Sequence, residues 1–366
     1  KKMPSLLGEV DIIRSTLLLP GVTNVGEGAS GFNVRGGNVD QNLILLDEAP
    51  VYNSSHLFGF FSVFNSDAIK DLKLYKGGIP AEYGGRLSSV MDVRQKEGNM
   101  KKFAASGGIS TVSSKLTLEG PISKDRSSFM IAARRTYIDW LAHLVGELEN
   151  QDAYFYDLNA KVNYVLNDNN RLFLSAYYGN DVFKFGDDFR FVWGNNTFSA
   201  RWNHIFNQKL FSNFTLLYSD YAYSLGVPEG TDAFEWTSHI INTNLKGDFS
   251  YFINSSNTVK FGVSALQYTF KPGNITTSDE SFFNSFEIQN ERAFEPAIYA
   301  SNEHKINDRL TLQYGLRYSM FLNYGAADIS IYENDEPVDY DDPNAIGAVN
   351  DIVDTVSYAD YEVIKS

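Results

Sequence analysis

After about residue 101, the polarity of the chain alternates with a period of two residues over long stretches. In the stretch 241–251, mainly apolar residues at odd positions alternate with Asn, Lys, Asp and Ser at even positions. The stretch 309–320 alternates in the same way. Because successive side chains of a β-strand point to opposite faces, each stretch predicts a strand with one apolar face and one polar face.

The predicted strands are long. Several alternating stretches cover about ten residues or more, which is the length that a tilted strand needs to cross a bilayer, whereas strands of soluble domains usually have about five or six residues. We predict about eleven strands. They begin near residues 102, 114, 128, 154, 171, 191, 209, 235, 257, 291 and 308.

The predicted connections alternate in length. Short polar turns lie near 123–126, 167–170, 207–208, 254–257 and 306–308. Longer connections, richer in Gly, Asp, Asn and Ser, include 143–153, 225–234 and 272–290. Short turns at one rim and long loops at the other are typical of an outer-membrane β-barrel. A soluble β-sandwich or propeller is the alternative, and it would have shorter strands without this asymmetry.

Residues 1–97 follow a different pattern. Glycines punctuate short apolar runs such as 43–46 and 72–75, and a helix is predicted over Asp11–Leu19, ended by Pro20-Gly21. This region predicts a compact α+β domain. The domain division is therefore 1–97 and 98–366.

A compact domain of about 100 residues has a radius of gyration near 13 Å. A barrel that encloses such a plug has about 22 strands. We therefore predict that 98–366 is the N-terminal half of an all-β transmembrane barrel of about 22 antiparallel strands, of which about eleven are present, with the α+β domain inside its lumen. On this interpretation the chain is part of a longer protein, and the acidic segment 323–366 is an outer loop leading to the next strand.

Composition narrows the class of protein. The net charge of −14 argues against nucleic acid as a partner, because phosphate binding requires clustered Lys and Arg. Aromatic residues make up 14% of the chain, with 27 Phe and 22 Tyr, which suits the lipid-facing band and girdles of a barrel. The chain has no cysteine, and its apolar runs are shorter than the about 18 residues of a membrane-spanning helix.

The sequence carries no motif of the common hydrolase, nucleotide-binding or metalloprotease sites, and its five His residues are scattered. We therefore expect no enzyme, no cofactor and no metal, although a hydrolase built on barrel strands remains an alternative without a supporting motif. One acidic run has the ligand type that calcium prefers, but it lacks the glycine and terminal glutamate of a regular calcium loop, so a solvated loop is favoured. It comprises Glu333, Asp335, Glu336, Asp339, Asp341 and Asp342.

Five motifs follow one another in the first 97 residues. They are Leu19-Pro20-Gly21-Val22, Val34-Arg35-Gly36-Gly37, the stretch Leu45–Tyr52, the stretch Ala68–Gly78 and the stretch Ala81–Leu87. In order and spacing they resemble the plug domain of TonB-dependent outer-membrane receptors, most of all those of the Bacteroidetes group. The later part of the chain resembles these receptors only in its general pattern of strands and turns, and not in specific motifs. The motifs depart from the starch-utilisation type, so the resemblance does not imply oligosaccharide import.

This resemblance implies an import receptor in the outer membrane of a Gram-negative bacterium. It would capture a scarce ligand, such as a siderophore, a vitamin, a peptide or a glycan, and the TonB complex would displace the plug by acting on a segment upstream of residue 1. The implied partners are outer-membrane lipid, the TonB complex and, in some members, a surface-exposed lipoprotein. The alternative is a receptor-like barrel that serves as a structural or assembly subunit of an outer-membrane complex.

The resemblance also suggests site residues. Arg35 and Lys76 would pair with wall glutamates as a latch between plug and barrel, with Arg86 in the same set. Lysine at 76 in place of arginine loses the bidentate geometry. The neighbouring Gly36, Gly37, Gly77 and Gly78 would form plug turns. Solvated cations on ordinary turns are the alternative.

Two further features of the first 97 residues have two interpretations each. Asp47 either closes a turn through an Asx hydrogen bond or contacts ligand. The aromatic stretch with His56, Phe58, Phe60 and Phe61 either forms a plug apex that faces the substrate or packs in the core of the domain.

Overall fold

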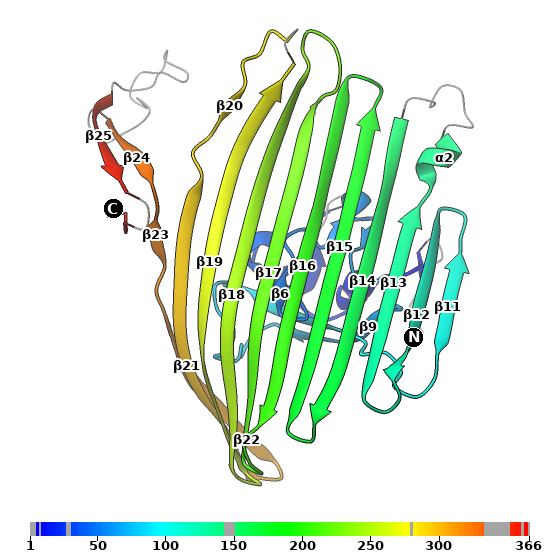
Figure 1. Ribbon diagram of the computed structural model, residues 1–366. Coiled ribbons are helices and arrows are strands. Elements are labelled where there is room, and N and C mark those ends of the chain that lie inside the picture. The colour runs from blue at the N-terminus through cyan, green and yellow to red at the C-terminus, as the bar shows by residue number, and fades with distance from the viewer. Residues whose placement is uncertain are drawn as a thin grey trace.

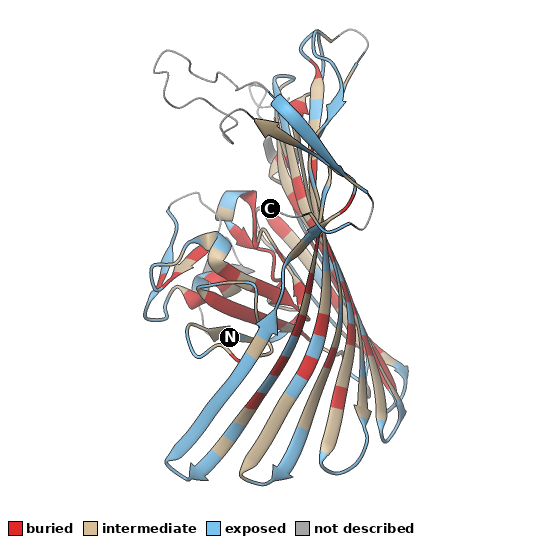
Figure 2. Ribbon diagram, turned by 90° about the vertical axis from the view of Figure 1, so that its left-hand side faces the viewer, coloured by how far each residue is buried: buried red, intermediate tan, exposed pale blue. Residues whose placement is uncertain are grey.

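The computed structural model describes residues 5–6, 9–26, 31–142, 151–278, 281–332, 352–359 and 362–364. One large antiparallel sheet and a smaller N-terminal domain make up the molecule, and the domain packs against one face of the sheet (Figures 1 and 2).

The N-terminal domain is built around a four-stranded sheet with the order β6-β5-β10-β9, in which β5 and β10 run parallel and the other neighbours antiparallel. These strands are β5 (Asn42–Leu46), β6 (Ala49–Pro50), β9 (Ile69–Tyr75) and β10 (Ser89–Gln95). Short pairs and 3-10 turns surround them: β1 (Ser5–Leu6), β2 (Glu9–Val10), β3 (Val22–Asn24), β4 (Phe32–Val34), η1 (Val39–Gln41), β7 (Ser55–His56), η2 (Leu57–Gly59) and β8 (Phe61–Ser62). The domain has an apolar core of its own, which includes Phe32, Leu46, Phe64, Met91 and Val93.

The predicted helix over Asp11–Leu19 is shorter in the structure. Helix α1 covers Ile12–Thr16, and the carboxylate of Asp11 caps it by accepting a hydrogen bond from the backbone N–H of Arg14 at 2.9 Å. The Thr16 hydroxyl donates to the carbonyl of Ile13 at 2.7 Å, and such local bonds compete with the helical ladder. The chain then passes through a turn to Gly21, whose φ of +76° suits glycine.

The large sheet follows the chain strand by strand. Its main path, within the part of the chain that the structure describes, is β11-β12-β13-β14-β15-β16-β17-β18-β19-β21-β22, all antiparallel, with the short β20 and β23 paired beside it. The strands are β11 (Ala104–Ile109), β12 (Ser113–Ser123), β13 (Ser127–Thr136), β14 (Gln151–Asn167), β15 (Asn170–Phe185), β16 (Phe189–Ile205), β17 (Leu210–Val227), β18 (Phe234–Asn254), β19 (Asn257–Thr277), β20 (Phe286–Glu287), β21 (Glu291–Asn307), β22 (Leu310–Ser319) and β23 (Leu322–Tyr324). The main path confirms the predicted strands and their approximate starts. A short helix, α2 (Ile138–Ala142), follows β13.

The connections differ from the prediction at the rim drawn at the top of Figure 1. The predicted loops 225–234 and 272–290 are partly strand, because β17 extends to Val227 and β19 to Thr277. The predicted loop after residue 323 is also partly strand, since β24 (Ala327–Tyr332) pairs antiparallel with β25 (Ile352–Tyr358). The acidic run between these two strands lies outside the described residues.

The polarity of the large sheet is inverted relative to a water-soluble sandwich. Along β14, most of the residues that face the N-terminal domain are polar and buried, including Asp157 and Asn159, whereas Leu158 between them is 44% exposed on the outer face. The outer face is apolar on the other strands as well, with exposed Leu216, Leu245, Val263, Ile298 and Leu316. A soluble sandwich would bury this apolar face in a core. An apolar outside around a polar inside is the arrangement of a transmembrane barrel wall.

No helix among the described residues has the length and apolar character needed to cross a membrane.

Candidate functional site

The interface between the N-terminal domain and the large sheet holds most of the buried charge. It begins at the two-residue turn between β5 and β6, where Asp47 and Glu48 have φ values of +46° and +76°. Positive φ at both central residues is the mirror-image turn that suits a tight hairpin. The turn brings two consecutive carboxylates to the end of the hairpin, beside the polar face of the large sheet.

Asp47 forms a buried ion pair across the interface. Its Oδ1 lies 2.8 Å from the Nζ of Lys161 on β14, and both side chains are almost fully buried. The same oxygen accepts a hydrogen bond from the backbone N–H of Gln95 at 3.3 Å. Asp47 therefore sits in a tight turn, as predicted, but its carboxylate binds the opposite wall and not its own turn.

Glu48 meets three cations. Its carboxylate lies 3.0 Å from Arg94 in the same domain, 3.3 Å from Arg201 on β16 and 3.1 Å from Lys246 on β18. Burial by itself raises the pKa of Glu48, but the three cations outweigh it and hold the pKa well below its usual range. Glu48 therefore remains ionised and bridges two strands of the sheet to the N-terminal domain.

In three more ion pairs, the N-terminal domain again supplies the carboxylate and the large sheet supplies the cation. Each joins a carboxylate of the first 97 residues to a cation of the large sheet: Asp67 with Lys115 at 2.9 Å, Glu82 with Lys260 at 3.2 Å and Glu97 with Arg171 at 2.9 Å. These pairs are partly exposed, so each contributes less than the buried pairs of Asp47 and Glu48. The two regions are thus complementary in charge, with the anions on the domain.

The predicted latch residues lie elsewhere. Lys76 donates a hydrogen bond to the carbonyl of Pro20 at 2.7 Å, inside the domain. Arg35 has a φ of +50°, and its guanidinium lies so close to Gly77 that a Cβ there would be 2.7 Å from Nη1. Among the described residues, neither cation pairs with a carboxylate of the sheet. The proposed latch through these two side chains stays a prediction.

Arg86 differs from the other two, because it lies at the interface. Its Nη1 donates to the carbonyl of Gly85 at 2.7 Å. It lines a cavity of about 90 Å³ between domain and sheet, together with Glu295, Arg317 and Tyr268.

Among the glycines of these motifs, Gly36 and Gly78 have φ values of +82° and +58°, which fits the predicted turns. Gly37 is needed for another reason. A Cβ at this position would lie 2.5 Å from the Oγ of Ser88, so the two backbones could not approach as they do.

The structure divides the predicted aromatic apex into two pairs. His56 and Phe61 are buried, at 1% and 3% exposure, which agrees with the interpretation that they pack inside. Phe58 and Phe60 are 41% and 51% exposed. The ring of Phe58 also contacts two aromatic side chains of the sheet, Phe183 at 5.5 Å and Trp193 at 5.0 Å between ring centroids. Whether this exposed pair faces a substrate stays a prediction.

His56 is buried against two carboxylates of the sheet. Its Nδ1 lies 2.6 Å from Asp181 on β15, and its Nε2 lies 3.4 Å from Asp157 on β14. Asp157 in turn pairs with Arg134 on β13 at 2.5 Å. We call His56, Arg134, Asp157 and Asp181 the His56 cluster.

Sequence reasoning missed the sheet residues of these contacts. Lys161 and Lys246 occupy positions on strand faces that are otherwise mainly Asn, Ser and Thr. An isolated cation on a polar face is a signal that could have identified them, because a buried charge needs a partner. Nothing along the sequence indicates which carboxylate that partner is, since Asp47 and Lys161 are 114 positions apart.

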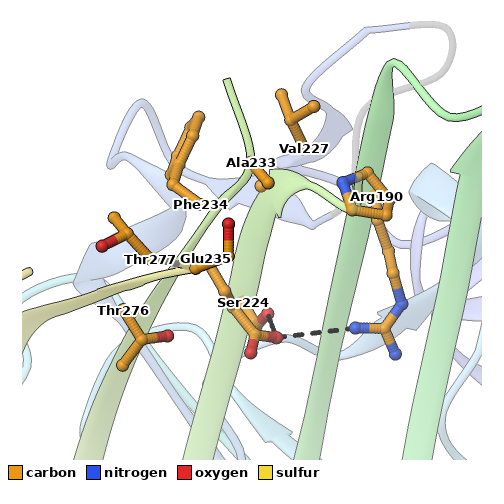
Figure 3. A pocket seen from close by; sticks show the side chains of 11 residues that line it. Arg190, Ser224, Val227, Ala233, Phe234, Glu235, Thr276 and Thr277 are labelled. Carbon is orange, nitrogen blue, oxygen red and sulfur yellow. Dashed lines mark hydrogen bonds and ion pairs between the residues drawn. The ribbon is translucent and has the colours of Figure 1, made fainter. Parts of the chain in front are cut away.

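A second pocket lies at the rim of the sheet, on its outer face (Figure 3). Arg190 on β16 and Glu235 on β18 form an ion pair of 3.5 Å there, and the hydroxyl of Ser224 donates to Glu235 at 2.6 Å. Both charged side chains are about half exposed. The pocket has a volume of about 360 Å³ and does not border the N-terminal domain.

No group of three or more His, Cys, Asp or Glu residues in the described ranges is arranged to hold a metal ion.

Residues 8–89 match the model of the TonB-dependent receptor plug domain. This segment is a TonB-dependent receptor plug domain. From here on, we call the N-terminal domain the plug and the large sheet the wall. No curated protein matches the chain in sequence.

Solved structures resemble the chain over both regions. A mutant of the ferric enterobactin receptor from Pseudomonas aeruginosa has a TM-score of 0.62 at 15% identity, covering 86% of this chain and 56% of that one. The FrpB iron transporter from Neisseria meningitidis has a TM-score of 0.65 at 13% identity, covering 87% and 56%. The siderophore receptor PirA from Acinetobacter baumannii has a TM-score of 0.63 at 14% identity, covering 86% and 55%.

The chain thus spans little more than half the length of these structures. At these identities the likeness establishes the fold, a plug against the wall of a TonB-dependent receptor barrel. Together with the plug domain and the apolar outer face, it assigns the chain to the outer membrane of a Gram-negative bacterium.

Proposed function

We propose that the chain supplies the plug and part of the wall of a transporter that imports a scarce ligand through the outer membrane, with the TonB complex displacing the plug. The domain division in this proposal is 1–97 for the plug and 98–366 for the N-terminal half of the barrel. TonB would act through a segment before residue 1. A surface-exposed lipoprotein is a further proposed partner.

The observation that carries the proposal is the character of the plug–wall interface. It is held largely by ion pairs and hydrogen bonds, among them those of Asp47 and Glu48. Its apolar contacts are confined to Tyr177 at the edge of the plug core and to two small clusters, Leu57 and Phe61 with Phe155, and Ala68 with Met130 and Ala132. Polar groups of such an interface can be rehydrated when the plug moves, whereas a merged apolar core would expose its full area to water. This favours a removable plug over a permanent structural one.

Transport against a gradient needs an external source of energy, because binding alone can only shift an equilibrium by its differential affinity. A plug held by several buried charges remains closed unless work is done on it. The TonB complex is the proposed source of that work.

The ligand of this transporter is a siderophore, a vitamin, a peptide or a glycan in our proposal, and its contact on the plug is the exposed pair Phe58 and Phe60. Two features support this placement. The two rings are exposed although they are large and apolar, and Phe58 packs beside aromatic residues of the wall.

Cysteine labelling in intact cells tests the proposal, because the chain has no cysteine of its own. Asn159→Cys places a thiol on the inner face of the wall, where the side chain is 1% exposed and its amide makes no hydrogen bond in the structure. With an energised TonB complex and complete growth medium, we expect a membrane-impermeant maleimide to label this thiol. Deleting TonB or dissipating the proton gradient should abolish the labelling.

Asp232→Cys, in the exposed connection between β17 and β18, is the control for a thiol that plug movement does not uncover. If labelling at 159 is the same with and without TonB and the gradient, the importer proposal fails. The alternative, a structural or assembly subunit, predicts that result.

A further inference from the structure

The His56 cluster differs from the other ionic contacts at the plug–wall interface because the plug contributes an imidazole and not a carboxylate. The imidazole of His56 stands between two wall carboxylates, 2.6 Å from Asp181 through Nδ1 and 3.4 Å from Asp157 through Nε2. All three side chains are at most 2% exposed. Water therefore does not screen these charges.

The charge of the cluster depends on one proton. Arg134 supplies one positive charge, and Asp157 and Asp181 supply two negative charges, so a neutral imidazole leaves a net charge of −1 in a buried place. A protonated imidazole makes the cluster neutral and can donate from both ring nitrogens at once. A carboxylate left without a partner in such a place is strongly destabilising.

The surroundings confine the imidazole. Its ring stacks on Phe155 at 4.1 Å between centroids, and the guanidinium of Arg134 lies 4.9 Å from the centroid of the same ring. The buried hydroxyl of Tyr177 lies 3.3 Å from Nε2. On the plug side, the carboxylate of Asp11 adds an attraction for Arg134. Apart from Asp11, the charged groups that face His56 come from wall strands β13, β14 and β15.

The same wall residues hold the plug backbone. The carboxylate of Asp181 accepts a hydrogen bond from the N–H of Leu57 at 2.8 Å, and Arg134 donates to the carbonyl of Ser62 at 2.7 Å. The first bond holds the start of the turn between β7 and β8, and the second holds the end of β8. Within that turn, Leu57 and Phe58 have φ values of +46° and +54°.

Consecutive residues with side chains rarely adopt positive φ, and such strain persists only where contacts enforce it. The bond from the N–H of Leu57 to Asp181 is one such contact. The His56 cluster therefore contributes to holding Phe58 beside Phe183 and Trp193.

We propose that the His56 cluster is a proton-dependent anchor, which holds the turn between β7 and β8 against the wall while His56 is protonated and frees the turn when His56 is neutral. The role of this anchor in transport rests on the proposed function, but its existence does not. In acidic medium the turn is fixed, and once His56 has lost its proton at higher pH the turn moves before the rest of the plug.

The sign of the pH dependence follows from the geometry. Burial by itself lowers the pKa of His56, but Asp181 and Asp157 outweigh it, and the net effect raises the pKa above its usual range. The anchoring is complete below about pH 6.5, the ordinary pKa of histidine, and is lost as the pH rises through the raised pKa of the folded protein. Between these limits the closed turn holds one proton more than the open turn, so opening increases by at most about tenfold per pH unit.

The test uses the full-length protein, purified in detergent without TonB or ligand. Ser55→Cys places a near-isosteric thiol in β7, next to His56, at a position that is 6% exposed. Its maleimide labelling rate is divided by that of the exposed Asp232→Cys at each pH, which corrects for the ionisation of the thiol. We expect this ratio to rise by about tenfold or more between pH 6.5 and pH 9.

Two variants in the Ser55→Cys background show whether His56 is the titrating group. With His56→Gln, the ratio should be high at pH 6.5 and constant up to pH 9. With Asp181→Asn, which keeps the shape but removes one carboxylate, the rise should occur at lower pH. The matched control is His239→Gln, because His239 pairs with Asp220 at 3.0 Å on the outer face of the wall, away from the plug. It should leave the profile unchanged.

A ratio that does not change with pH in the His56 protein would overturn the proposal. So would a pH dependence that persists in His56→Gln. If His56→Gln fails to fold, the Asp181→Asn profile decides, and an unshifted profile counts against the anchor. Since neither TonB nor ligand is present, these results do not depend on the importer proposal, which the labelling at 159 tests separately.

Discussion

The plug and the wall satisfy the hydrophobic effect in opposite ways. The plug buries Phe32, Phe64 and Met91 in a core, as a soluble domain does. The wall places Leu245, Val263 and Leu316 on its outside and turns Asn, Lys and Ser toward the plug. The difference follows from the solvent on each side, since lipid accepts apolar side chains and the plug offers polar partners. The same residue types therefore stabilise the protein at different places in the two regions.

The largest loss of stability is expected from a substitution in the plug core. Phe64 is 1% exposed, so Phe64→Ala removes a buried ring and leaves a cavity, which should cost about 3–5 kcal/mol of plug stability. Hydrogen exchange of β5 and β10 amides measures this. The matched control is Phe198→Ala, since Phe198 is 40% exposed on the outer face of the wall. Equal losses for the two variants would contradict the comparison.

A similar loss is expected where the two regions meet. Lys161→Met leaves Asp47 buried without its cation, and breaking a buried ion pair in this way costs about 3–5 kcal/mol. The double variant Asp47→Asn with Lys161→Met should recover much of that loss. The free energy of plug release in denaturant should be measured for the single variant and for the double variant. If the double variant is as unstable as Lys161→Met alone, the unpaired charge is not the cause.

A somewhat smaller effect is expected on the lipid side. Leu245 lies near the middle of β18 and is 60% exposed on the outer face. Leu245→Arg should destabilise the wall in a bilayer by about 2–4 kcal/mol, the cost of an arginine near the bilayer midplane. Asp232→Arg, in the exposed connection between β17 and β18, introduces the same side chain outside the sheet and should have little effect. Folding titrations in lipid vesicles measure the stability of the two variants relative to the unchanged protein.

The smallest change in stability is expected when the ion pair at the rim of the wall is broken. Arg190 and Glu235 form an ion pair that is about half exposed, so Arg190→Ala should change stability by about 0–1 kcal/mol, and less in high salt. Arg201→Ala is the contrasting variant, because Arg201 binds the buried Glu48. An Arg190→Ala loss as large as that of Arg201→Ala would show that solvent does not screen the rim.

The sequence predicted the secondary structure of the wall better than that of the plug. In the wall, alternation over long stretches fixes both the strand and its two faces, and the predicted starts agree with the structure. The helix of the plug was predicted too long, because local hydrogen bonds of Thr16 and the following turn ended it early. The connections 225–234 and 272–290 were predicted as loops, but ladder hydrogen bonds between neighbouring strands extend β17 and β19 into them.

The candidate site was predicted less well. His56 was identified from its aromatic surroundings in the sequence, but its partner Asp181 lies 125 positions away. The stretch with Asp47 and Glu48 was noted as a motif, whereas Lys161, Arg201 and Lys246 were not. The structure shows carboxylates of the plug paired with cations of the wall, and the predicted pairs of Arg35 and Lys76 are not among its described contacts.

The sequence by itself determined the strands of the wall, their two faces and the resemblance of the first 97 residues to a plug. These features depend on residues close together in the chain, where backbone geometry sets the period. Only the tertiary structure decided which charges meet, because electrostatic partners are chosen by distance in space. It also decided which of the aromatic residues near His56 are buried, since burial depends on the wall that packs against them.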